Sequence, residues 1–204
     1  MALIIGLTGS IGTGKTMIAN KFRELNIPVV DADVIAREVV EPGREAYTSI
    51  VATFGETIVQ HNQTLDRKKL GNIVFNDEEK RKKLNAIVHP AIRKEMIRQR
   101  DALVDQGEKC VVLDIPLLYE SGLTHFVDKV IVVSVDADIQ LERILKRDNL
   151  TTEEAKSRIN AQIPVSEKAK KADAVINNNG TKEDSYRQLI AILTEWGVYS
   201  SNNR

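Results

Sequence analysis

The 204-residue chain has few of the residues that build disulfide-stapled, metal-clustered or base-stacking proteins. Its one cysteine, Cys110, excludes an intramolecular disulfide and a zinc site made of several thiolates. Aromatic residues make up 4% of the chain, too few for a platform that stacks bases. The 29 basic and 29 acidic residues give no formal net charge, which disfavours a generally basic nucleic-acid binder but not a local positive cleft. We therefore expect no nucleic-acid partner.

Long apolar runs are also missing, since none approaches the roughly 18 residues that a membrane span needs. The apolar residues 2–7 have no basic flank and lead into a glycine-rich loop. They predict a first strand rather than a signal peptide. We therefore expect a cytoplasmic protein with no membrane partner, present as a monomer or a weak homo-oligomer.

Five short runs of apolar, β-prone residues predict the strands of one sheet. Because these runs do not alternate between apolar and polar residues, they are typical of parallel strands covered on both faces. Ile18, Phe22 and Leu25 lie on one face of a helix between the first two runs. The fold class is therefore α/β, a doubly wound, parallel five-stranded sheet. The predicted strands are residues 2–7, 28–30, 110–115, 130–135 and 174–176.

Two long gaps between strands predict helical insertions into a single domain spanning residues 1–204. We expect a core of residues 1–33, 108–140 and 172–204, an insert at about 34–107 and a lid at about 141–171. In the insert, Asp66 is expected to cap a helix that ends at Phe75, and Asn76 or Asp77 to start the next.

Further helix boundaries follow from proline and from capping residues. His89-Pro90 is expected to open another helix of the insert, which runs toward Val104. In the lid, the Thr151–Glu154 pattern predicts a capping box, and Pro164 is expected to end that helix. Thr181 followed by Asp184 predicts a cap for a terminal helix that runs through Trp196 and stops at Gly197.

Residues 9–16, GSIGTGKT, match the phosphate-loop pattern G-x-x-x-x-G-K-[ST], directly after a predicted strand and at the start of a predicted helix. Glycines allow successive backbone N–H groups to turn inward, and the helix N-terminus adds a partial positive charge. Lys15 is expected to reach the β- and γ-phosphates, and the Thr16 hydroxyl to coordinate Mg²⁺. The loop predicts a nucleoside triphosphate but does not indicate what accepts the phosphate.

The remaining motifs narrow the class of nucleotide-binding protein. The guanine pattern N-K-x-D and the switch pattern D-x-x-G are both missing, so a small-molecule kinase fits better than a regulatory GTPase. A kinase for another nucleoside or small alcohol is the second hypothesis. The third is a binding protein that senses ATP without transferring phosphate.

Acidic residues that follow the second and third strands are candidates for the acceptor side, because ligands of open α/β sheets lie at the carboxyl ends of the strands. Asp33 could orient or deprotonate an attacking hydroxyl, whereas Asp31 or Asp33 could instead cap the next helix. Arg37 could hold an anionic substrate group or pair with an acid. Asp114 ends the third strand in a Walker B-like pattern, where it could hold Mg²⁺ through water or serve as a turn residue.

These segments occur together in an order that resembles the dephospho-CoA kinase family. The similarity runs from residue 3 to about residue 200, and the ordered set is more specific than any single motif. The segments that carry it are the phosphate loop, DADVIAR (31–37), VVEPG (39–43), His89-Pro90, DIPLL (114–118), residues 140–148 and residues 172–180.

The resemblance implies that ATP phosphorylates the ribose 3′-hydroxyl of dephospho-CoA, the last step of coenzyme A biosynthesis. It also implies that the insert binds the acceptor and that Mg²⁺ accompanies ATP. Thr16 departs mildly from the family pattern, in which serine is common at this position. Asp33 is implied as the base, and the expected substrate-binding residues are Asp33, Arg37, His89, Arg93 and Leu117.

The predicted lid carries eight basic and five acidic residues. Such a run is usually a solvated face, yet phosphoryl transfer also needs cations around the moving group. Arg143 and Arg147 lie one helical turn apart, so both can face the phosphates. We favour Arg143 as the transition-state arginine and assign Arg147 to structure or ATP binding, with Arg158 as the next candidate.

The nucleotide site is completed by a loop after the fifth strand, where Asn177 and Gly180 are similar to the segment that borders adenine in such kinases. A plain Asn-Gly turn is the alternative. The expected catalytic residues are Asp33, Lys15 and Arg143, and the expected metal ligand is Thr16. The expected ATP-binding residues are Gly9, Ile11, Gly12, Thr13, Gly14, Lys15, Thr16, Met17, Arg143, Arg147, Asn177 and Gly180.

Overall fold

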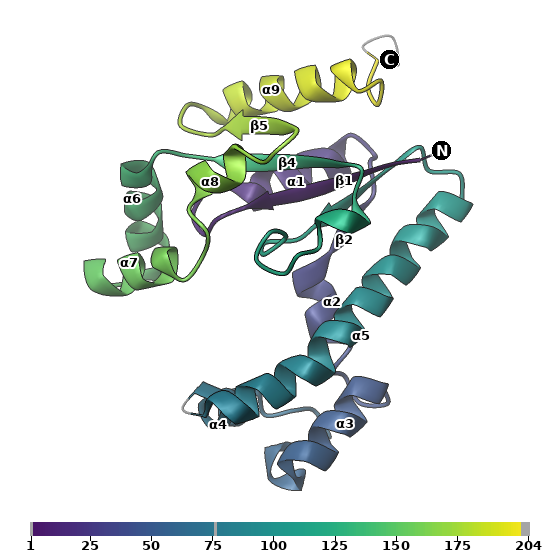
Figure 1. Ribbon diagram of the computed structural model, residues 1–204, viewed down its shortest axis with the longest axis vertical. Coiled ribbons are helices and arrows are strands. Elements are labelled where there is room, and N and C mark those ends of the chain that lie inside the picture. Colours follow the sequence, from purple (N-terminus) through teal and green to yellow (C-terminus); the bar gives the residue numbers. More distant parts are fainter. Residues whose placement is uncertain (1, 76, 201–204) are drawn as a thin grey trace. The chain divides into compact units, whose positions relative to one another are not determined.

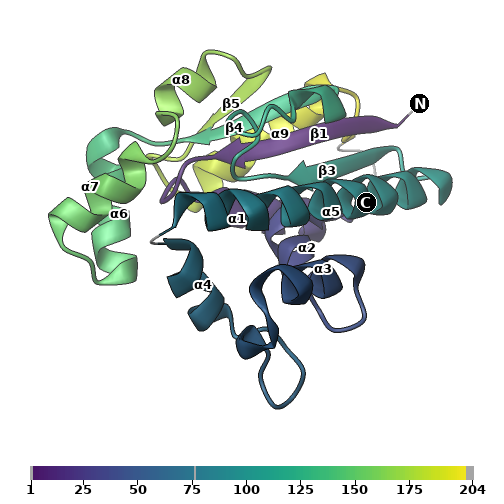
Figure 2. The ribbon, with the colours of Figure 1, turned by 60° about the horizontal axis from the view of Figure 1, so that its bottom comes forward.

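A computed structural model describes residues 2–75 and 77–200 and confirms the α/β class. Five strands form one sheet in the order β2-β3-β1-β4-β5. β1 pairs in parallel with β4, and β4 with β5 (Figure 1). On its other side, β1 pairs in parallel with β3 (Figure 2). The predicted strands are confirmed to within two residues at each end. They are β1 (Leu3–Gly9), β2 (Val29–Asp31), β3 (Cys110–Asp114), β4 (Lys129–Ser134) and β5 (Ala174–Asn177).

The chain divides into two units, one made of Met1–Val30 with Ala102–Arg204 and the other of Asp31–Asp101. The first unit holds the sheet and the phosphate loop. Its helices are α1 (Lys15–Glu24), η2 (Thr124–Phe126), α6 (Ala137–Asp148), α7 (Thr152–Asn160), α8 (Val165–Ala169) and α9 (Lys182–Glu195).

The core of the first unit lies between the sheet and two helices. Phe22 of α1 and Leu189 of α9 are fully buried in one cluster with Ile5 and Leu7 of β1. Helix α1 contacts both β1 and α9, and α9 contacts β5. The expected apolar face of α1 is confirmed, because Ile18 and Phe22 are buried and Leu25 packs against the cluster. This packing holds α1 against β1, the central strand, so the phosphate loop that joins the two has a fixed start and a fixed end.

The second unit is helical. Its elements are α2 (Ala32–Glu38), α3 (Glu45–Phe54), η1 (Glu56–Ile58), α4 (Arg67–Phe75) and α5 (Glu78–Asp105), whose long rod is clear in Figure 2. Asp66 accepts a hydrogen bond from Lys69 N at 2.8 Å, which confirms it as the cap of α4. Asp77 accepts one from Lys80 N at 3.0 Å and starts α5. The alternative start, Asn76, lies outside the described residues.

The expected helix start at His89-Pro90 is wrong, because α5 continues through Pro90 without a break. The fixed φ of proline is close to the helical value, so the residue can continue a helix. Its missing N–H removes one backbone hydrogen bond, and its ring crowds one carbonyl of the preceding turn. Here the helix extends on both sides of that position, and Met96 is buried beyond it. A proline signal by itself did not show that the residues before it were already helical.

The helices of the predicted lid, and α9 after it, begin at their predicted capping residues, but the predicted proline stop is not found. Thr151 and Glu154 form the predicted capping box, and so do Thr181 and Asp184 at α9. The prediction that Pro164 ends the lid helix is wrong, since α7 ends at Asn160 and Pro164 is the residue before α8. Proline is favoured at helix starts, where its missing N–H is not needed. In the part of the chain that the structure describes, no helix is long and apolar enough to cross a membrane.

Candidate active site

The phosphate loop joins the end of β1 at Gly9 to the start of α1 at Lys15. Gly12 and Gly14 have φ values of 80° and 89°, which side chains with a Cβ rarely adopt. Gly14 caps α1 without any side-chain hydrogen bond to the first turn. The first N–H groups of α1 are therefore uncapped by a side chain, as a helix N-terminus that receives an anion requires.

Side chains of other elements also pack directly against Gly12 and Gly14. A Cβ added to Gly12 would lie 2.8 Å from Cγ1 of Ile144 on α6. A Cβ added to Gly14 would overlap the side-chain nitrogen of Asn178. Both positions therefore need glycine for space as well as for backbone conformation.

Asn178, which the sequence analysis did not select, is hydrogen-bonded to the backbone of the phosphate loop. Its Nδ2 donates to the Thr13 carbonyl at 2.8 Å, and its Oδ1 accepts from the Ser185 hydroxyl at 2.8 Å. Asn178 and Ser185 are both buried. The neighbouring residue Asn177, which was predicted to border adenine, is exposed, and its backbone pairs with the Gln188 side chain. Gly180 is exposed beside Asp184.

Lys15 and Asp114 form an ion pair at the carboxyl ends of β1 and β3. Lys15 Nζ lies 2.5 Å from Asp114 Oδ1, and the Asp114 side chain is almost fully buried. Thr16 is exposed on the first turn of α1, and Met17 follows it, half-buried. The structure thus places a buried carboxylate against the phosphate-loop lysine, and the Thr16 hydroxyl belongs to the next residue of the chain.

The two candidate arginines of α6 differ in their surroundings. Arg143 Nη2 donates to the Asn178 carbonyl at 2.9 Å, so this side chain lies beside the loop residue Gly14. Arg147 makes two hydrogen bonds to the Asp148 carboxylate, at 2.7 and 2.9 Å. These bonds lower the pKa of Asp148, and Arg158 lowers it further. Of the two arginines of α6, Arg143 is the one that lies beside the phosphate loop.

The residues of α2 that were predicted for the acceptor side differ in their contacts. Asp31 caps α2 by accepting from the backbone N–H groups of Asp33 and Val34. Of the alternatives for these carboxylates, the capping role therefore belongs to Asp31. The Asp33 carboxylate is exposed and has no hydrogen bond or ion pair to any described residue. Asp33 and Arg37 lie one turn apart on α2.

The other predicted acceptor residues are similarly accessible. His89 and Arg93 lie one turn apart on α5, with His89 exposed and Arg93 half-buried. Neither Arg37 nor Arg93 pairs its guanidinium with an acid among residues 2–75 and 77–200. Leu117 belongs to the first unit, just after β3, and is 42% exposed. Unpaired guanidinium groups keep their full capacity to bind an anion.

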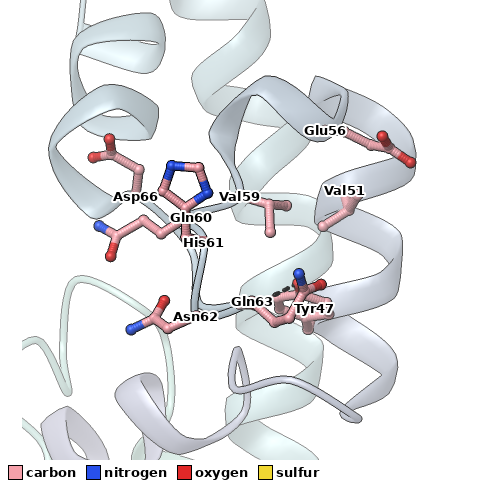
Figure 3. A pocket seen from close by; sticks show the side chains of 9 residues that line it. All are labelled: Tyr47, Val51, Glu56, Val59, Gln60, His61, Asn62, Gln63 and Asp66. Carbon is pink, nitrogen blue, oxygen red and sulfur yellow. Dashed lines mark hydrogen bonds between the residues drawn. The ribbon is translucent and has the colours of Figure 1, made fainter.

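A hollow of about 990 Å³ lies within the second unit (Figure 3). Tyr47 of α3 donates to the Gln63 carbonyl at 2.6 Å across one side of it. No lysine or arginine lines it, so it does not match a polyphosphate, and its amide, imidazole and carboxylate groups suit neutral or cationic polar ligands. Its lining residues are Tyr47, Val51, Glu56, Val59, Gln60, His61, Asn62, Gln63 and Asp66.

Cys110 is buried at the start of β3, as expected for a core residue. Burial raises the pKa of its thiol to about 12, because the thiolate would lose its solvation, and the Glu108 carboxylate adds to the shift. A thiol of this kind remains protonated at neutral pH and is a poor nucleophile. Cys110 has no place in the site chemistry.

A parallel sheet whose first strand runs into a glycine-rich loop and an uncapped helix start defines a P-loop kinase fold. The structure of a shikimate kinase from Bacteroides thetaiotaomicron shares this fold, with a TM-score of 0.51 at 18% identity over 96% of this chain and 98% of that chain. The family model for dephospho-CoA kinase matches residues 3–184, so the chain belongs to the dephospho-CoA kinase family.

Similar proteins agree with this family over nearly their whole lengths. The chain is 61% identical to a dephospho-CoA kinase of Geobacillus kaustophilus, over 96% of this chain and 98% of the relative. It is 32% identical to the structure of a dephospho-CoA kinase from Campylobacter jejuni, with a TM-score of 0.74 over 96% and 98% of the two chains. The family expected from the ordered motifs is confirmed.

Proposed function

We propose that this chain transfers the γ-phosphoryl group of ATP to the ribose 3′-hydroxyl of dephospho-CoA, which gives coenzyme A and ADP. The observation that carries the proposal is the enclosed phosphate loop, in a chain whose family match spans residues 3–184. Loop amides and Lys15 bind the phosphates, and the helix N-terminus adds its partial positive charge. The acceptor is assigned from the family to which the chain belongs.

Magnesium accompanies the nucleotide in this proposal. The Thr16 hydroxyl and the Asp114 carboxylate are hard oxygen ligands, the kind that Mg²⁺ prefers, and Asp114 lies beside the phosphate-loop lysine. These residues therefore fit the ion. When bound, Mg²⁺ neutralises charge that develops on the β- and γ-phosphates. Lys15 then donates to the phosphates, in competition with its contact to Asp114.

On the acceptor side, Asp33 accepts the proton of the attacking hydroxyl. Its exposed carboxylate, with no described partner, supports this role, whereas Asp31 is engaged in capping α2. Arg37, His89 and Arg93 bind the anionic groups of the acceptor, and Leu117 contacts its apolar surface. In this scheme the second unit, Asp31–Asp101, is the helical insert that binds the acceptor.

Arg143 stabilises the charge that moves during transfer. Its contact with the Asn178 carbonyl supports this assignment over Arg147, which pairs with Asp148. The remaining nucleotide contacts, at Asn177 and Gly180, stay predictions from sequence. So do the cytoplasmic location and the monomeric or weakly associated state.

The proposal is tested by measuring ADP release from Mg-ATP with dephospho-CoA, and with AMP, adenosine or no acceptor as controls. We expect ADP release that depends on dephospho-CoA, with the new phosphate on the ribose 3′ position. The Lys15→Ala variant, which lacks the phosphate-binding ammonium, is expected to lose both nucleotide affinity and transfer. ADP release with AMP but not with dephospho-CoA would show that AMP, rather than dephospho-CoA, is the acceptor. Tight ATP binding without transfer to any acceptor would favour an ATP sensor.

A further inference from the structure

Lys168 on α8 is a lysine whose side chain is fully buried. Its Nζ lies 2.7 Å from Glu120 Oε1 and donates to the carbonyls of Gly9, at 3.2 Å, and Pro116, at 3.4 Å. An ammonium has three protons, so these three acceptors occupy it completely. A buried charge is retained only where it is paired and hydrogen-bonded, and Lys168 meets both conditions.

The segment around Lys168 is hydrogen-bonded to the first residues of the phosphate loop. Ser10 Oγ donates to the Ile163 carbonyl at 3.2 Å, and Ile11 N donates to Gln162 Oε1 at 2.9 Å. With the contact between Lys168 and Gly9, residues 162–168 touch three consecutive loop residues. We call the three residues that make these contacts, Gln162, Ile163 and Lys168, the latch.

Glu120 connects the latch to the core of the first unit. Its Oε1 accepts from Ile163 N at 3.1 Å as well as from Lys168 Nζ. One carboxylate oxygen therefore ties two residues of the latch to the segment that follows β3. The ion pair fixes the position of the ammonium and of the backbone that carries it.

The contact with Gly9 orients the backbone from which the loop begins. A peptide unit is planar, so holding the Gly9 carbonyl fixes the orientation of the whole Gly9–Ser10 peptide. Gly9 itself has no room for a side chain, since an added Cβ would lie 2.6 Å from Thr13 Oγ1 and 2.9 Å from the Val133 carbonyl. Preorganised amides are more effective than amides that must reorient when the phosphate arrives.

We propose that Lys168, paired with Glu120, is a positioning residue for phosphoryl transfer, because it holds the phosphate loop in its nucleotide-binding conformation through the Gly9 carbonyl. Its ammonium is buried and fully occupied, so it acts through the loop and does not touch the nucleotide. The latch accordingly belongs to the scaffold of the phosphate loop, although it lies within the stretch predicted to be the lid. The proposal rests on the proposed function only for its turnover measurement.

The test compares two variants with two controls. Lys168→Met removes the ammonium but leaves Glu120 buried and unpaired, which can prevent folding. Lys168→Met combined with Glu120→Leu removes both charges and so leaves no unpaired buried ion; it lacks the bond to Gly9 and also the acceptor of Ile163 N. Val165→Ala trims a buried apolar side chain of the same helix, and Lys170→Met removes an exposed lysine that pairs with Glu167.

For the double variant we expect the Kd for Mg-ATP to rise about tenfold or more and kcat to fall by a similar factor. The KM for dephospho-CoA is expected to stay within about twofold. Amide hydrogen exchange of residues 10–14 in the free protein is expected to accelerate in the double variant and not in the controls. The controls should keep Kd and kcat near those of the parent, even where Val165→Ala lowers the melting temperature.

A folded double variant with unchanged ATP affinity and unchanged amide exchange would overturn the proposal. The same holds if Val165→Ala weakens ATP binding as much as the double variant does, since general destabilisation would then account for the effect. ATP binding and amide exchange require no acceptor. They therefore test the positioning role even if dephospho-CoA proves to be the wrong acceptor.

Discussion

Lys15 Nζ and Asp114 Oδ1 lie 2.5 Å apart, so the lysine that is expected to bind phosphate is paired with the carboxylate expected to face the metal. A bound phosphate and Asp114 attract the same ammonium, so nucleotide binding is expected to weaken or replace this contact. Asp114 thus has two effects: it competes with phosphate for Lys15, and it supplies an oxygen ligand for Mg²⁺. The two effects can be separated by measuring binding with and without the metal.

Asp114→Asn is expected to lower kcat by about 100-fold, because the neutral amide is a weaker metal ligand. Metal-free ATP is expected to bind at least as tightly as to the parent, since Lys15 no longer has a charged competitor. Titration with ATP in EDTA and steady-state kinetics in Mg²⁺ give the two quantities. Asp105→Asn, which neutralises an exposed carboxylate, is the control. Unchanged turnover would remove Asp114 from the metal site.

Asp33→Asn is expected to reduce kcat by about 10²- to 10⁴-fold, the range for loss of a positioned general base. Asparagine keeps the shape but cannot take the hydroxyl proton. ATP affinity, measured by direct titration, is expected to change less than twofold, because Asp33 is outside the phosphate loop. Glu38→Gln neutralises another carboxylate on α2 and serves as the control. A variant at position 33 with full turnover would rule out this base.

Asn178→Asp replaces the donor that faces the Thr13 carbonyl with a carboxylate oxygen. The carboxylate oxygen and the Thr13 carbonyl are both acceptors, so the hydrogen bond between the two residues is lost. The substitution also buries a negative charge that has no partner of opposite charge. We expect a loss of about 2–3 kcal/mol in unfolding free energy and a rise of about tenfold in the Kd for Mg-ATP. Denaturant unfolding and nucleotide titration measure both.

The neighbouring substitution Asn179→Asp is the control for this prediction. Asn179 Oδ1 accepts a hydrogen bond from Asp136 N at 2.8 Å, and a carboxylate can accept the same bond. The control is therefore expected to keep the parent affinity for Mg-ATP. If Asn178→Asp behaved like the control, the buried bond to Thr13 would not hold the loop.

Local sequence signals predicted the sheet and the phosphate loop because both depend on neighbouring residues. Apolar runs set the strands, and the glycines at positions 12 and 14 satisfy the loop's backbone angles directly. Capping residues such as Thr151 and Asp66 also act within one turn, and their helices begin where predicted. The helix boundaries predicted from Pro90 and Pro164 were wrong, because a single proline is compatible with the interior of a helix as well as with its start.

The supports of the loop could not be predicted in this way, because they join residues far apart in sequence. Asn178 lies 165 residues from Thr13, and Lys168 lies 159 residues from Gly9. In the sequence, Asn178 is one of three asparagines in a turn, and Lys168 is one cation of a basic run. Only the fold shows that both are buried and that each points at a carbonyl of the phosphate loop.

Glu95 on α5 provides a pH-dependent test in the second unit. Arg98 donates to both of its carboxylate oxygens, at 2.8 and 2.6 Å, and Gln99 donates at 2.9 Å. These bonds, with Arg98 first, lower the pKa of Glu95 from 4.5 to about 2. A depressed pKa means that the stabilisation is complete above the unfolded-state value of 4.5 and is lost as the pH falls toward 2.

Glu95→Gln is therefore expected to reduce the unfolding free energy by about 1 kcal/mol at pH 7, a modest value because the Arg98 side chain is 66% exposed and screened by water. The difference from the parent is expected to shrink by more than half by about pH 3, where the parent carboxylate is protonated in the unfolded state. Urea unfolding of both proteins from pH 7 to pH 3 measures this difference. Glu79→Gln breaks a more exposed pair with Lys82 and should cost less than about 0.5 kcal/mol. A Glu95 effect that is constant across this pH range would show that packing, rather than the ion pair, gives α5 its stability here.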